Sequence, residues 1–421
     1  MKILKVGICG WGNVATGMFN AIESNNKFIK QSGVNIDISC IGARRDNPKC
    51  NPGNVPVFRD IFEIPDQDID VVIELIGGVE VARELILKSI RAGKHVITAN
   101  KAVIFNHGDE IFAEANNYNV KVLFEAAVCA GTPIVKMLKE ELASNKIKKI
   151  SGMLNGTSNF ILSNMEEGNE FRSTLELAQQ EGYAEPDPSF DIDGVDAAHK
   201  IGLLSYIAYG LSLPPKEFYI EGITKIDKKD FIYAEMLGYT IKHLAVSMDN
   251  DESIELRAHP ALVSKDSYLA NLKGVRNGIE VDTDLIGKIH IAGSGAGQES
   301  TASGLISDII HLANSNNNML NFVSSSDEKP IKEFKDFSFQ YYFYIEVEDN
   351  PGVMASITTA LAESNIGIES MVQKEDLGNN LVPIILISDI FKENKLEGIK
   401  DKILSLSSVT NLRTIRIEST D

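Results

Sequence analysis

The densest group of side chains that could do chemistry lies in residues 181–200, which read EGYAEPDPSFDIDGVDAAHK. Its first sixteen residues hold six carboxylates: Glu181, Glu185, Asp187, Asp191, Asp193 and Asp196. The pattern predicts a helix that begins near Asp193, whose side chain can accept hydrogen bonds from the free N–H groups of the first turn. So many acids just ahead of a helix indicate either a ligand site or a solvated acidic turn.

Asp196 and Lys200 are four residues apart, acid before base, which is the favourable order for a pair on one helix face. The apolar residues that follow surround the predicted helix on nearly all sides, so the helix is expected to be buried. Desolvating both charges is costly, which argues against a merely structural pair. A lysine in a dry site has a lowered pKa that a neighbouring acid raises again, so such a pair can exchange protons near neutral pH.

Two other acids of this stretch, Glu185 and Asp191, suit a substrate that carries an ammonium group. The alternative is a solvated charge run. A calcium loop built on Asp191, Asp193 and Gly194 is excluded, because no glutamate closes the loop and the next turn is predicted to be helical.

A nucleotide-binding pattern opens the chain. The apolar residues 3–9 (ILKVGIC) run into Gly10-Trp11-Gly12-Asn13-Val14-Ala15, followed by a predicted helix to about residue 25. G-x-G-x-x-A between a strand and a helix is typical of dinucleotide binding, because the glycines let the backbone approach a pyrophosphate at the helix N-terminus. A simple glycine turn is the alternative. The expected cofactor contacts are Gly10, Trp11, Gly12, Asn13 and Val14.

The second predicted strand, residues 35–41, ends at Gly42-Ala43-Arg44-Arg45. An NAD site typically has an acid here to bind the ribose hydroxyls, whereas guanidinium groups suit a 2′-phosphate. Arg44 and Arg45 therefore favour NADP. Asp46 follows closely enough to leave NAD open.

Strands and helices then alternate, which predicts a parallel sheet with helices on both faces. The expected strands are 71–76, 95–98 and 121–124, and the expected helices are 82–92 and 109–116. Ligands bind at the carboxyl ends of such strands, where Gly77, Lys101 and Glu125 fall. Lys101 is expected to contact cofactor or substrate, with a solvated loop lysine as the alternative.

The regular alternation of predicted strands and helices ends at about Pro133. We expect a helix at 134–143, a strand at 147–154, a polar turn at 155–159, and strands at 254–258, 278–283 and 289–291. A second glycine loop, residues 293–297, precedes a helix at 301–314 and either covers the far side of the cofactor or is a simple turn. Residues 324–335 are polar and unpatterned, which indicates a linker.

The tail predicts the order β-α-β-β-α-β of a ferredoxin-like fold. Its strands are expected at 341–347, 367–373, 383–387 and 411–417, and its helices at 354–364 and 395–405. The turn Asp349-Asn350-Pro351-Gly352 opens the first of these helices, where free amides could meet the carboxylate of an effector.

Composition restricts the class of protein. The 421 residues, 43% hydrophobic and 24% charged, are enough for two or three domains. A net charge of −18 argues against nucleic acid or an anionic membrane as the main partner. No apolar run approaches eighteen residues, and the four cysteines lack metal-ligand spacing, so we expect a cytoplasmic protein with reduced thiols.

Together these stretches resemble homoserine dehydrogenases along the whole chain. The matching segments are GWGNVA (10–15), ELIGG (74–78), TANKA (98–102), EAAVCAGTP (125–133), NGTSNFIL (155–162) and the 183–200 motif. The tail segment 346–370 is similar to an ACT domain, a small ligand-binding module. Two departures are Ala15, which replaces the usual third glycine, and Cys129 at a small-residue position, which leaves thiol sensitivity open.

The resemblance implies an α/β protein of three parts. These are a Rossmann-type domain (1–132), an α+β catalytic and dimerisation domain (133–323) whose last helix returns to the first domain, and, after a linker (324–338), a ferredoxin-like ACT domain (339–421). It implies NAD(P)-dependent reduction of aspartate semialdehyde to homoserine in threonine, methionine and isoleucine biosynthesis. The expected assembly is a dimer or tetramer, with an amino acid such as threonine as effector.

The resemblance also assigns roles to residues. Lys200 is the proton donor and acceptor, with Asp196 beside it and Lys101 in support. The substrate would contact Glu185, Asp191, Gly156 and Thr157. The cofactor would also contact Ile76, Gly77, Lys101 and Gly297. A monovalent cation, Na⁺ or K⁺, would be held by Glu125, Val128, Ala130 and Thr132. The effector would bind at Asp349, Asn350 and Gly352.

Two other functions remain open from the sequence. A semialdehyde dehydrogenase that forms a thioester needs an activated cysteine, for which Cys129 is the candidate. An NADP-binding amino-acid sensor without turnover would use the same nucleotide loop and tail. If the tail only regulates, its removal should spare activity.

Overall fold

The computed structural model describes residues 1–315, 328–373 and 381–419. The chain forms two compact units, and two of its elements run from one unit into the other. The first unit holds residues 1–150, 198–217 and 276–329, and the second holds 151–197, 218–275 and 330–421. Strand β7 (Ile147–Met153) and helix α8 (Val195–Tyr209) are the shared elements. No helix in the described ranges is both long and apolar enough to span a bilayer.

The first unit is built on a six-stranded sheet in the order β3-β2-β1-β4-β5-β6, with all pairs parallel. Its strands are β1 (Lys2–Cys9), β2 (Val34–Gly42), β3 (Val57–Phe58), β4 (Val71–Glu74), β5 (His95–Thr98) and β6 (Val122–Leu123). The strand order reverses direction between β1 and β4, which is where a doubly wound sheet binds a nucleotide. The predicted Rossmann-type sheet is confirmed.

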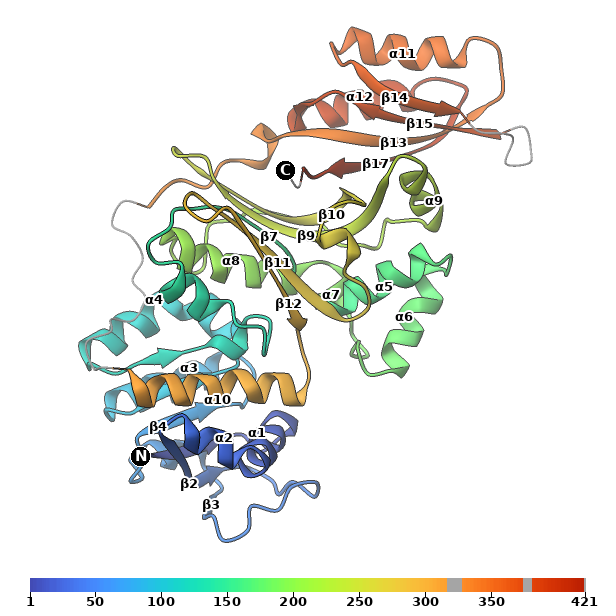
Figure 1. Cartoon of the computed structure of the whole chain (residues 1–421). Coiled ribbons are helices and arrows are strands. Elements are labelled where there is room, and N and C mark those ends of the chain that lie inside the picture. The colour runs from blue at the N-terminus through green and yellow to red at the C-terminus, as the bar shows by residue number, and fades with distance from the viewer. Residues whose placement is uncertain (316–327, 374–380, 420–421) are drawn as a thin grey trace. The chain divides into compact units, whose positions relative to one another are not determined.

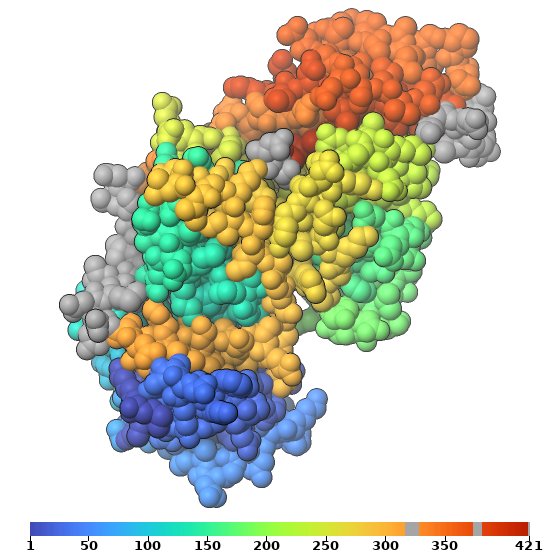
Figure 2. All heavy atoms as spheres, in the orientation of Figure 1, coloured from blue at the N-terminus to red at the C-terminus, as the bar shows by residue number. Residues whose placement is uncertain are grey.

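Helices cover both faces of this sheet: α1 (Asn13–Ser24), α2 (Asn26–Gln31), α3 (Glu80–Arg91), α4 (Lys101–Asn117) and α10 (Gln298–Asn314). Helix α10, late in the sequence, packs against α1 around Met18, Ile22 and Leu305 (Figures 1 and 2). Gly17 allows this approach, because a Cβ there would lie 2.7 Å from the Gln298 carbonyl oxygen. The start of α10 is therefore held beside the first glycine loop.

Two predictions for this unit need correction. Helix α4 begins at Lys101 rather than near residue 109, because the Asn100 side chain caps it by accepting from the Val103 N–H, and its backbone is irregular at His107. The segment predicted as an α-helix at 134–143 contains a π-helix, Met137–Glu141. Both helix types place apolar residues on one face, so the sequence pattern does not separate them.

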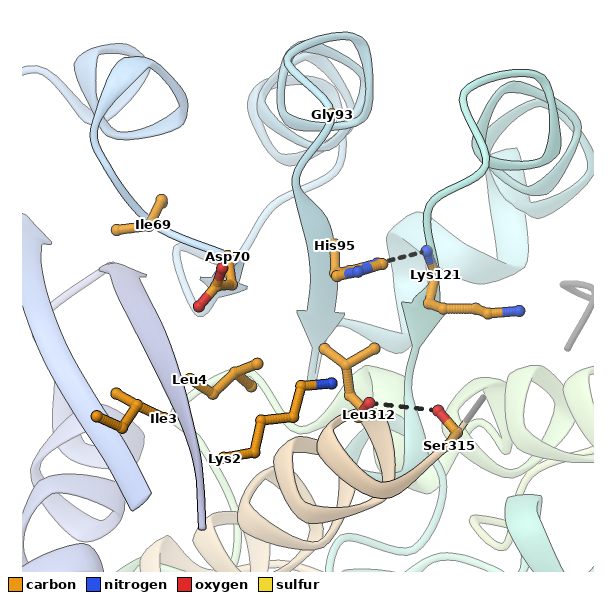
Figure 3. Close-up of a pocket in the computed structure, with 10 residues that line it drawn as sticks. All are labelled: Lys2, Ile3, Leu4, Ile69, Asp70, Gly93, His95, Lys121, Leu312 and Ser315. Carbon is orange, nitrogen blue, oxygen red and sulfur yellow. Dashed lines mark hydrogen bonds between the residues drawn. The ribbon is translucent and has the colours of Figure 1, made fainter. Parts of the chain in front are cut away.

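A cavity of about 220 Å³ lies at the amino ends of β1, β4, β5 and β6, lined among others by Lys2, Asp70, His95 and Lys121 (Figure 3). The Nδ1 atom of His95 accepts a hydrogen bond from the Lys121 backbone N–H over 2.9 Å. This cavity is at the opposite end of the strands from the glycine loop, so it is not the nucleotide site.

The rest of the first unit includes the antiparallel pair β11 (Arg276–Thr283) and β12 (Lys288–Ser294) and the 3₁₀ turns Ile61–Asp66 and Glu125–Ala127.

The second unit contains a continuous run of strands in the order β9-β10-β17-β13-β15-β14. These are β9 (Tyr239–Asp249), β10 (Ile254–Ser264), β17 (Val409–Ile417), β13 (Ser338–Glu348), β15 (Leu381–Ser388) and β14 (Ile368–Gln373), with the short β8 (Tyr219–Ile220) and β16 (Phe391–Lys392) beside them. The sequence prediction missed β9 and ended β10 at residue 258. Buried polar residues in β9 (Lys242, His243) and Pro260 in β10 hide the strand pattern.

The helices of this unit are α5 (Gly156–Glu166), α6 (Phe171–Gln180), α7 (Ser189–Ile192), α9 (Lys228–Met236), α11 (Val353–Glu363) and α12 (Leu396–Leu404). The tail has the predicted order β13-α11-β14-β15-α12-β17, and its own four strands are antiparallel neighbours. Figure 1 shows α11 on the side of this sheet away from β9 and β10. The ferredoxin-like tail is confirmed.

The tail shares a core with the preceding part of the unit. Tyr342, Tyr344 and Ile417 pack in one cluster with residues from α5, α9 and β9, while the opposite face of the same sheet packs on α11 and α12. Strand β17 also pairs in parallel with β10, Ala261 opposite Arg416. Of the expected linker, residues 324–327 lie outside the described residues, and the remainder includes Phe334, stacked on Tyr219. Because that core is shared, we expect deletion of the tail to destabilise the unit rather than spare activity.

Candidate functional site

The first glycine loop has the geometry that a pyrophosphate needs. Gly10 adopts φ 99°, and a Cβ there would lie 2.5 Å from the Leu75 carbonyl oxygen, so only glycine fits. Gly12 faces open space, and helix α1 begins after it without a side-chain cap. The first N–H groups of α1 are therefore available to an anion. The indole of Trp11 is buried and donates to the Cys50 carbonyl oxygen, so Trp11 could contact a cofactor only through its backbone.

Glu74, at the end of β4, organises the neighbouring loops, and sequence reasoning gave it no role. Its carboxylate is fully buried and accepts hydrogen bonds from the Thr98 hydroxyl (2.5 Å) and the Ile76 N–H (2.9 Å). Burial raises its pKa. The amide of Asn100 then donates to the Gly78 carbonyl oxygen over 2.7 Å. An acid inside an apolar strand, VVIE, was the signal that could have identified it.

These contacts hold the loop of Gly77 and Gly78, which have φ 70° and 76° and no neighbour where a Cβ would stand. The loop thus leaves open space at the carboxyl end of β4, next to half-buried Ile76. Lys101, the first residue of α4, follows the end of β5 and is half-buried. Ile76, Gly77 and Lys101 are consequently gathered at the edge of the sheet that also carries Gly10.

Arg44 and Arg45 are exposed after the end of β2. Asp46, the acid that could bind the ribose hydroxyls of NAD instead, forms a salt bridge with Arg59, whose Nη2 lies 2.7 Å from the Asp46 Oδ1.

The second glycine loop ends at Gly297, which has φ 110° and precedes α10 without a side-chain cap. Since α10 packs on α1, Gly297 is brought to the region of the first loop.

The loop 125–133 is shaped by Glu125, whose buried carboxylate accepts from the N–H groups of Ile134, Val135 and Lys136 at 2.8–2.9 Å. Within the described ranges, no donor meets the carbonyl oxygens of Val128, Ala130 or Thr132. The Thr132 hydroxyl is also buried and has no hydrogen-bond partner among the residues that the structure describes. No cluster of three or more His, Cys, Asp or Glu suited to a metal occurs among the described residues. The oxygens of this loop fit a hard monovalent cation bound mainly through the backbone.

Cys129 lies in the same loop with a left-handed backbone, φ 56°. Its side chain is fully buried, and the Asn277 amide donates to its sulfur over 3.4 Å. A reactive thiol needs access to its substrate and an electropositive setting. This burial argues against a thioester mechanism.

In the second unit, Asn155 gathers two of the predicted acids. Its Nδ2 donates to Asp191 Oδ1 over 2.7 Å and to Asp196 Oδ2 over 2.8 Å, while its Oδ1 accepts from the Ser158 N–H and caps α5. The Asn155 side chain is itself buried. Sequence reasoning named only its neighbours Gly156 and Thr157, although an asparagine just before a predicted turn and helix is a capping signal.

The residues around Asn155 are tightly fitted. A Cβ on Gly156 would lie 2.7 Å from the Val275 carbonyl oxygen, and the Thr157 hydroxyl donates to the Tyr183 carbonyl oxygen over 2.6 Å. Glu185, in contrast, is exposed, so the structure does not bring its carboxylate into this cluster. Two carboxylates that share one amide can bind an ammonium group.

Helix α8 begins at Val195, two residues later than expected, after the short helix α7. Asp193 ends α7 instead of capping α8. Asp196 and Lys200 are 4% and 7% exposed, so both are removed from bulk water as predicted.

In the tail, Asp349, Asn350 and Gly352 are exposed before α11, which has no side-chain cap.

Comparisons with known proteins agree with this geometry. Family models match for the homoserine dehydrogenase NAD-binding domain (residues 10–125), homoserine dehydrogenase (133–310) and the ACT domain (341–407). A homoserine dehydrogenase of Pseudomonas aeruginosa is 44% identical over 99% of both chains, and one of Neisseria gonorrhoeae is 38% identical over 100% of this chain and 99% of that one.

Solved structures give the same result. A homoserine dehydrogenase from Thiobacillus denitrificans superposes with a TM-score of 0.92 at 39% identity, over 100% of this chain and 99% of that one. A hyperthermophilic archaeal homoserine dehydrogenase, solved in complex with NADPH, has a TM-score of 0.63 at 27% identity and covers 74% of this chain and 98% of its own. The chain therefore belongs to the homoserine dehydrogenase family.

Proposed function

We propose that Lys200 exchanges the proton in the reaction of this homoserine dehydrogenase, the NAD(P)-dependent reduction of L-aspartate 4-semialdehyde to L-homoserine. The supporting observation is that Lys200 and Asp196, four residues apart on α8, are both buried. When bound, the nicotinamide supplies the hydride. Lys200 gives a proton to the aldehyde oxygen in reduction and takes it back in oxidation, and Asp196 keeps the amine basic enough for both directions. Lys101, at the start of α4, assists.

Asp191, held by Asn155, binds the substrate ammonium, and Gly156 and Thr157 line the pocket. Glu185, whose side chain is exposed, joins them if it turns toward the substrate. The pairing of Asp191 and Asp196 through one amide supports this assignment, because an ammonium group is the natural counter-charge for two adjacent carboxylates. Holding the substrate in this way orients the aldehyde for hydride transfer.

We propose NADP as the preferred cofactor. Arg44 and Arg45 are exposed and available to a 2′-phosphate, whereas Asp46 is engaged by Arg59. The archaeal relative solved in complex with NADPH is consistent with this choice. Gly10, Gly12, Asn13 and Val14 hold the pyrophosphate, and Gly297 approaches from the start of α10.

We further propose that Na⁺ or K⁺ is held by the loop of Glu125, Val128, Ala130 and Thr132, where it would fix the loop conformation. For the tail, we propose threonine as the effector, bound at Asp349, Asn350 and Gly352, and a dimer or tetramer as the assembly. The ACT fold and the open start of α11 support an effector site. A biosynthetic enzyme whose four cysteines form no disulfide among the described residues fits a cytoplasmic location.

Initial rates of homoserine oxidation test the central proposal. Lys200→Met should lower kcat about 10²- to 10⁴-fold, the usual contribution of a general acid and base, while the Kd of NADPH from fluorescence titration stays near that of the wild type. Cys129→Ser is the matched control and should retain turnover. Full activity of Lys200→Met, or loss of turnover with Cys129→Ser alone, would contradict the proposal and favour the thioester mechanism. A purified wild-type protein without homoserine-dependent NADP reduction would favour the sensor.

A further inference from the structure

Arg416, on the last strand of the ACT tail, makes an unusual set of contacts for a regulatory module. It is 8% exposed, and its Nη1 donates to Glu221 Oε2 over 2.7 Å. Its Nε and Nη2 form a bidentate pair with Glu393 inside the tail, and Nη2 also donates to the Tyr219 hydroxyl over 3.1 Å. The guanidinium further stacks over the rings of Tyr219 and Phe334. Arg416 thus joins the tail to a segment outside it through geometrically specific bonds.

Glu221 receives Arg416 in a largely buried environment. Burial works against ionisation of its carboxyl group, yet the Arg416 charge and the Tyr219 hydroxyl, which donates over 2.7 Å, hold its pKa below the usual value. The backbone of Glu221 is fixed as well, because its carbonyl oxygen accepts from His243 Nε2 over 2.9 Å and its N–H donates to the Ala258 carbonyl oxygen over 2.8 Å. Both the side chain and the main chain of this residue are therefore anchored.

The segment that follows, residues 221–223, lies directly on the loop 192–194. The Ile223 N–H donates to the Ile192 carbonyl oxygen over 2.8 Å. Gly222 has no room for a side chain, since a Cβ would lie 2.3 Å from that same oxygen. Gly194, at φ 84°, is equally tight: a Cβ there would lie 2.8 Å from His243 Nε2 and 3.1 Å from the Glu221 carbonyl oxygen. A shift of 221–223 must therefore move 192–194.

The loop 192–194 connects the two acids of the substrate cluster. Asp191 precedes it and Asp196 follows two residues after it, and both accept from the single amide of Asn155. Their separation is thus set by the conformation of three intervening residues and Val195. A displacement of this loop would change the separation of the two acids and so weaken the two Asn155 hydrogen bonds, which are 2.7 and 2.8 Å long.

A cavity of about 160 Å³ lies between β17 and the segment 221–226, lined among others by Gly222, Lys225 and Thr414. Because this side of the segment is not filled by side chains, contacts across the cavity depend on polar groups such as the Arg416–Glu221 pair. Without that pair, the segment has space into which it can move.

We propose that Arg416 is a positioning residue for substrate binding: through Glu221 and the stacked segments 221–223 and 192–194, the ACT tail holds Asp191 and Asp196 in the arrangement that binds the substrate ammonium. This inference rests on the proposed role of those two acids. It makes the tail a structural part of the substrate site, and any ligand that shifts β17 changes substrate affinity by the same route.

Steady-state kinetics on the full-length protein test this inference. Glu221→Gln removes the charge that Arg416 meets while leaving the Arg416–Glu393 pair intact, and Arg416→Gln removes the positive charge and the bidentate guanidinium. Both should raise KM for homoserine about tenfold, a typical size for coupling through a packed network, with the KM for NADP changed less than about threefold. Arg416→Lys should restore part of the loss, because one of the donors remains.

Arg413→Gln is the matched control. Arg413 lies three residues earlier on the same strand, and its guanidinium pairs with buried Asp230 on α9 rather than with Glu221. Its loss should lower the melting temperature without raising KM for homoserine. Asp191→Asn tests the substrate site itself: if it leaves KM for homoserine unchanged, the proposed substrate site is wrong. If Asp191→Asn raises KM while Glu221→Gln does not, or if Arg413→Gln raises it equally, the positioning role of Arg416 is wrong.

Discussion

Replacing Asn155 probes the substrate cluster most directly. Its amide donates to Asp191 and Asp196, and its carbonyl oxygen caps α5 through the Ser158 N–H. Serine at this position retains a capping oxygen but has no NH₂ group for the two carboxylates. Asn155→Ser therefore isolates the loss of the two amide hydrogen bonds, whereas Asn155→Ala loses the cap as well.

The magnitude follows from the charges involved. A hydrogen bond to a charged group contributes about 1.5–3 kcal/mol, and Asp196 is buried, so its desolvated charge is left less well compensated. If the variant loses the free energy of one such hydrogen bond in substrate binding, kcat/KM for homoserine falls about 10- to 150-fold. Asn155→Ala should lose about 0.5–2 kcal/mol more in stability, the usual cost of an N-cap.

The assay compares kcat/KM for homoserine with the KM for NADP in each variant. Asn164→Ser is the control, because Asn164 lies on the same helix and its side-chain amide donates to the Phe160 carbonyl oxygen one turn earlier. We expect wild-type kinetics from this control. If Asn155→Ser kept wild-type kcat/KM while its melting temperature fell, the amide would be structural and the cluster of Asp191 and Asp196 would not be the substrate site.

Three other predictions concern the cofactor, the pH dependence and the cation. Replacing Arg44 and Arg45 together by alanine should weaken NADPH about tenfold or more while changing NADH little, as titration would show, and equal losses for both cofactors would contradict the 2′-phosphate assignment. Burial lowers the pKa of His243 to about 4, although its contacts with Glu221 and the charge of Asp196 oppose this shift. As the pH falls from 6.5 to 4, the imidazole is therefore protonated in the unfolded chain before it is protonated in the folded one. The free energy of unfolding should fall over this range, by up to roughly 3 kcal/mol. His243→Gln should reduce that loss in thermal melts across this range, and an unchanged slope would show that other groups cause it. Adding KCl or NaCl should raise the melting temperature above that in choline chloride at equal ionic strength, and Thr132→Val should diminish this difference if the loop binds the ion.

Much of the fold could be predicted because its signals are local. The strand, glycine turn and helix at residues 3–25 use a pattern that carries its own geometric reason, since Gly10 requires a left-handed backbone. The βαββαβ order of the tail follows from periodicity alone. Strand β9 was missed because Lys242 and His243 are buried in it, held by the Leu272 and Glu221 carbonyl oxygens. Those partners are 30 and 22 residues distant, and no local pattern reveals them.

The sequence by itself determined which functional groups the protein has: a glycine loop for a dinucleotide, arginines for a phosphate, and an acid and a lysine one helical turn apart in an apolar helix. Only the tertiary structure decided which acids act together, because Asn155 lies 36 and 41 residues from Asp191 and Asp196, and Glu185 stays exposed although it is closer to both in sequence. It also decided that the tail is joined to the substrate loop, through Arg416 and Glu221, 195 residues apart. Side-chain type and helical period are local properties, whereas hydrogen-bond partners between distant segments depend on how the whole chain packs.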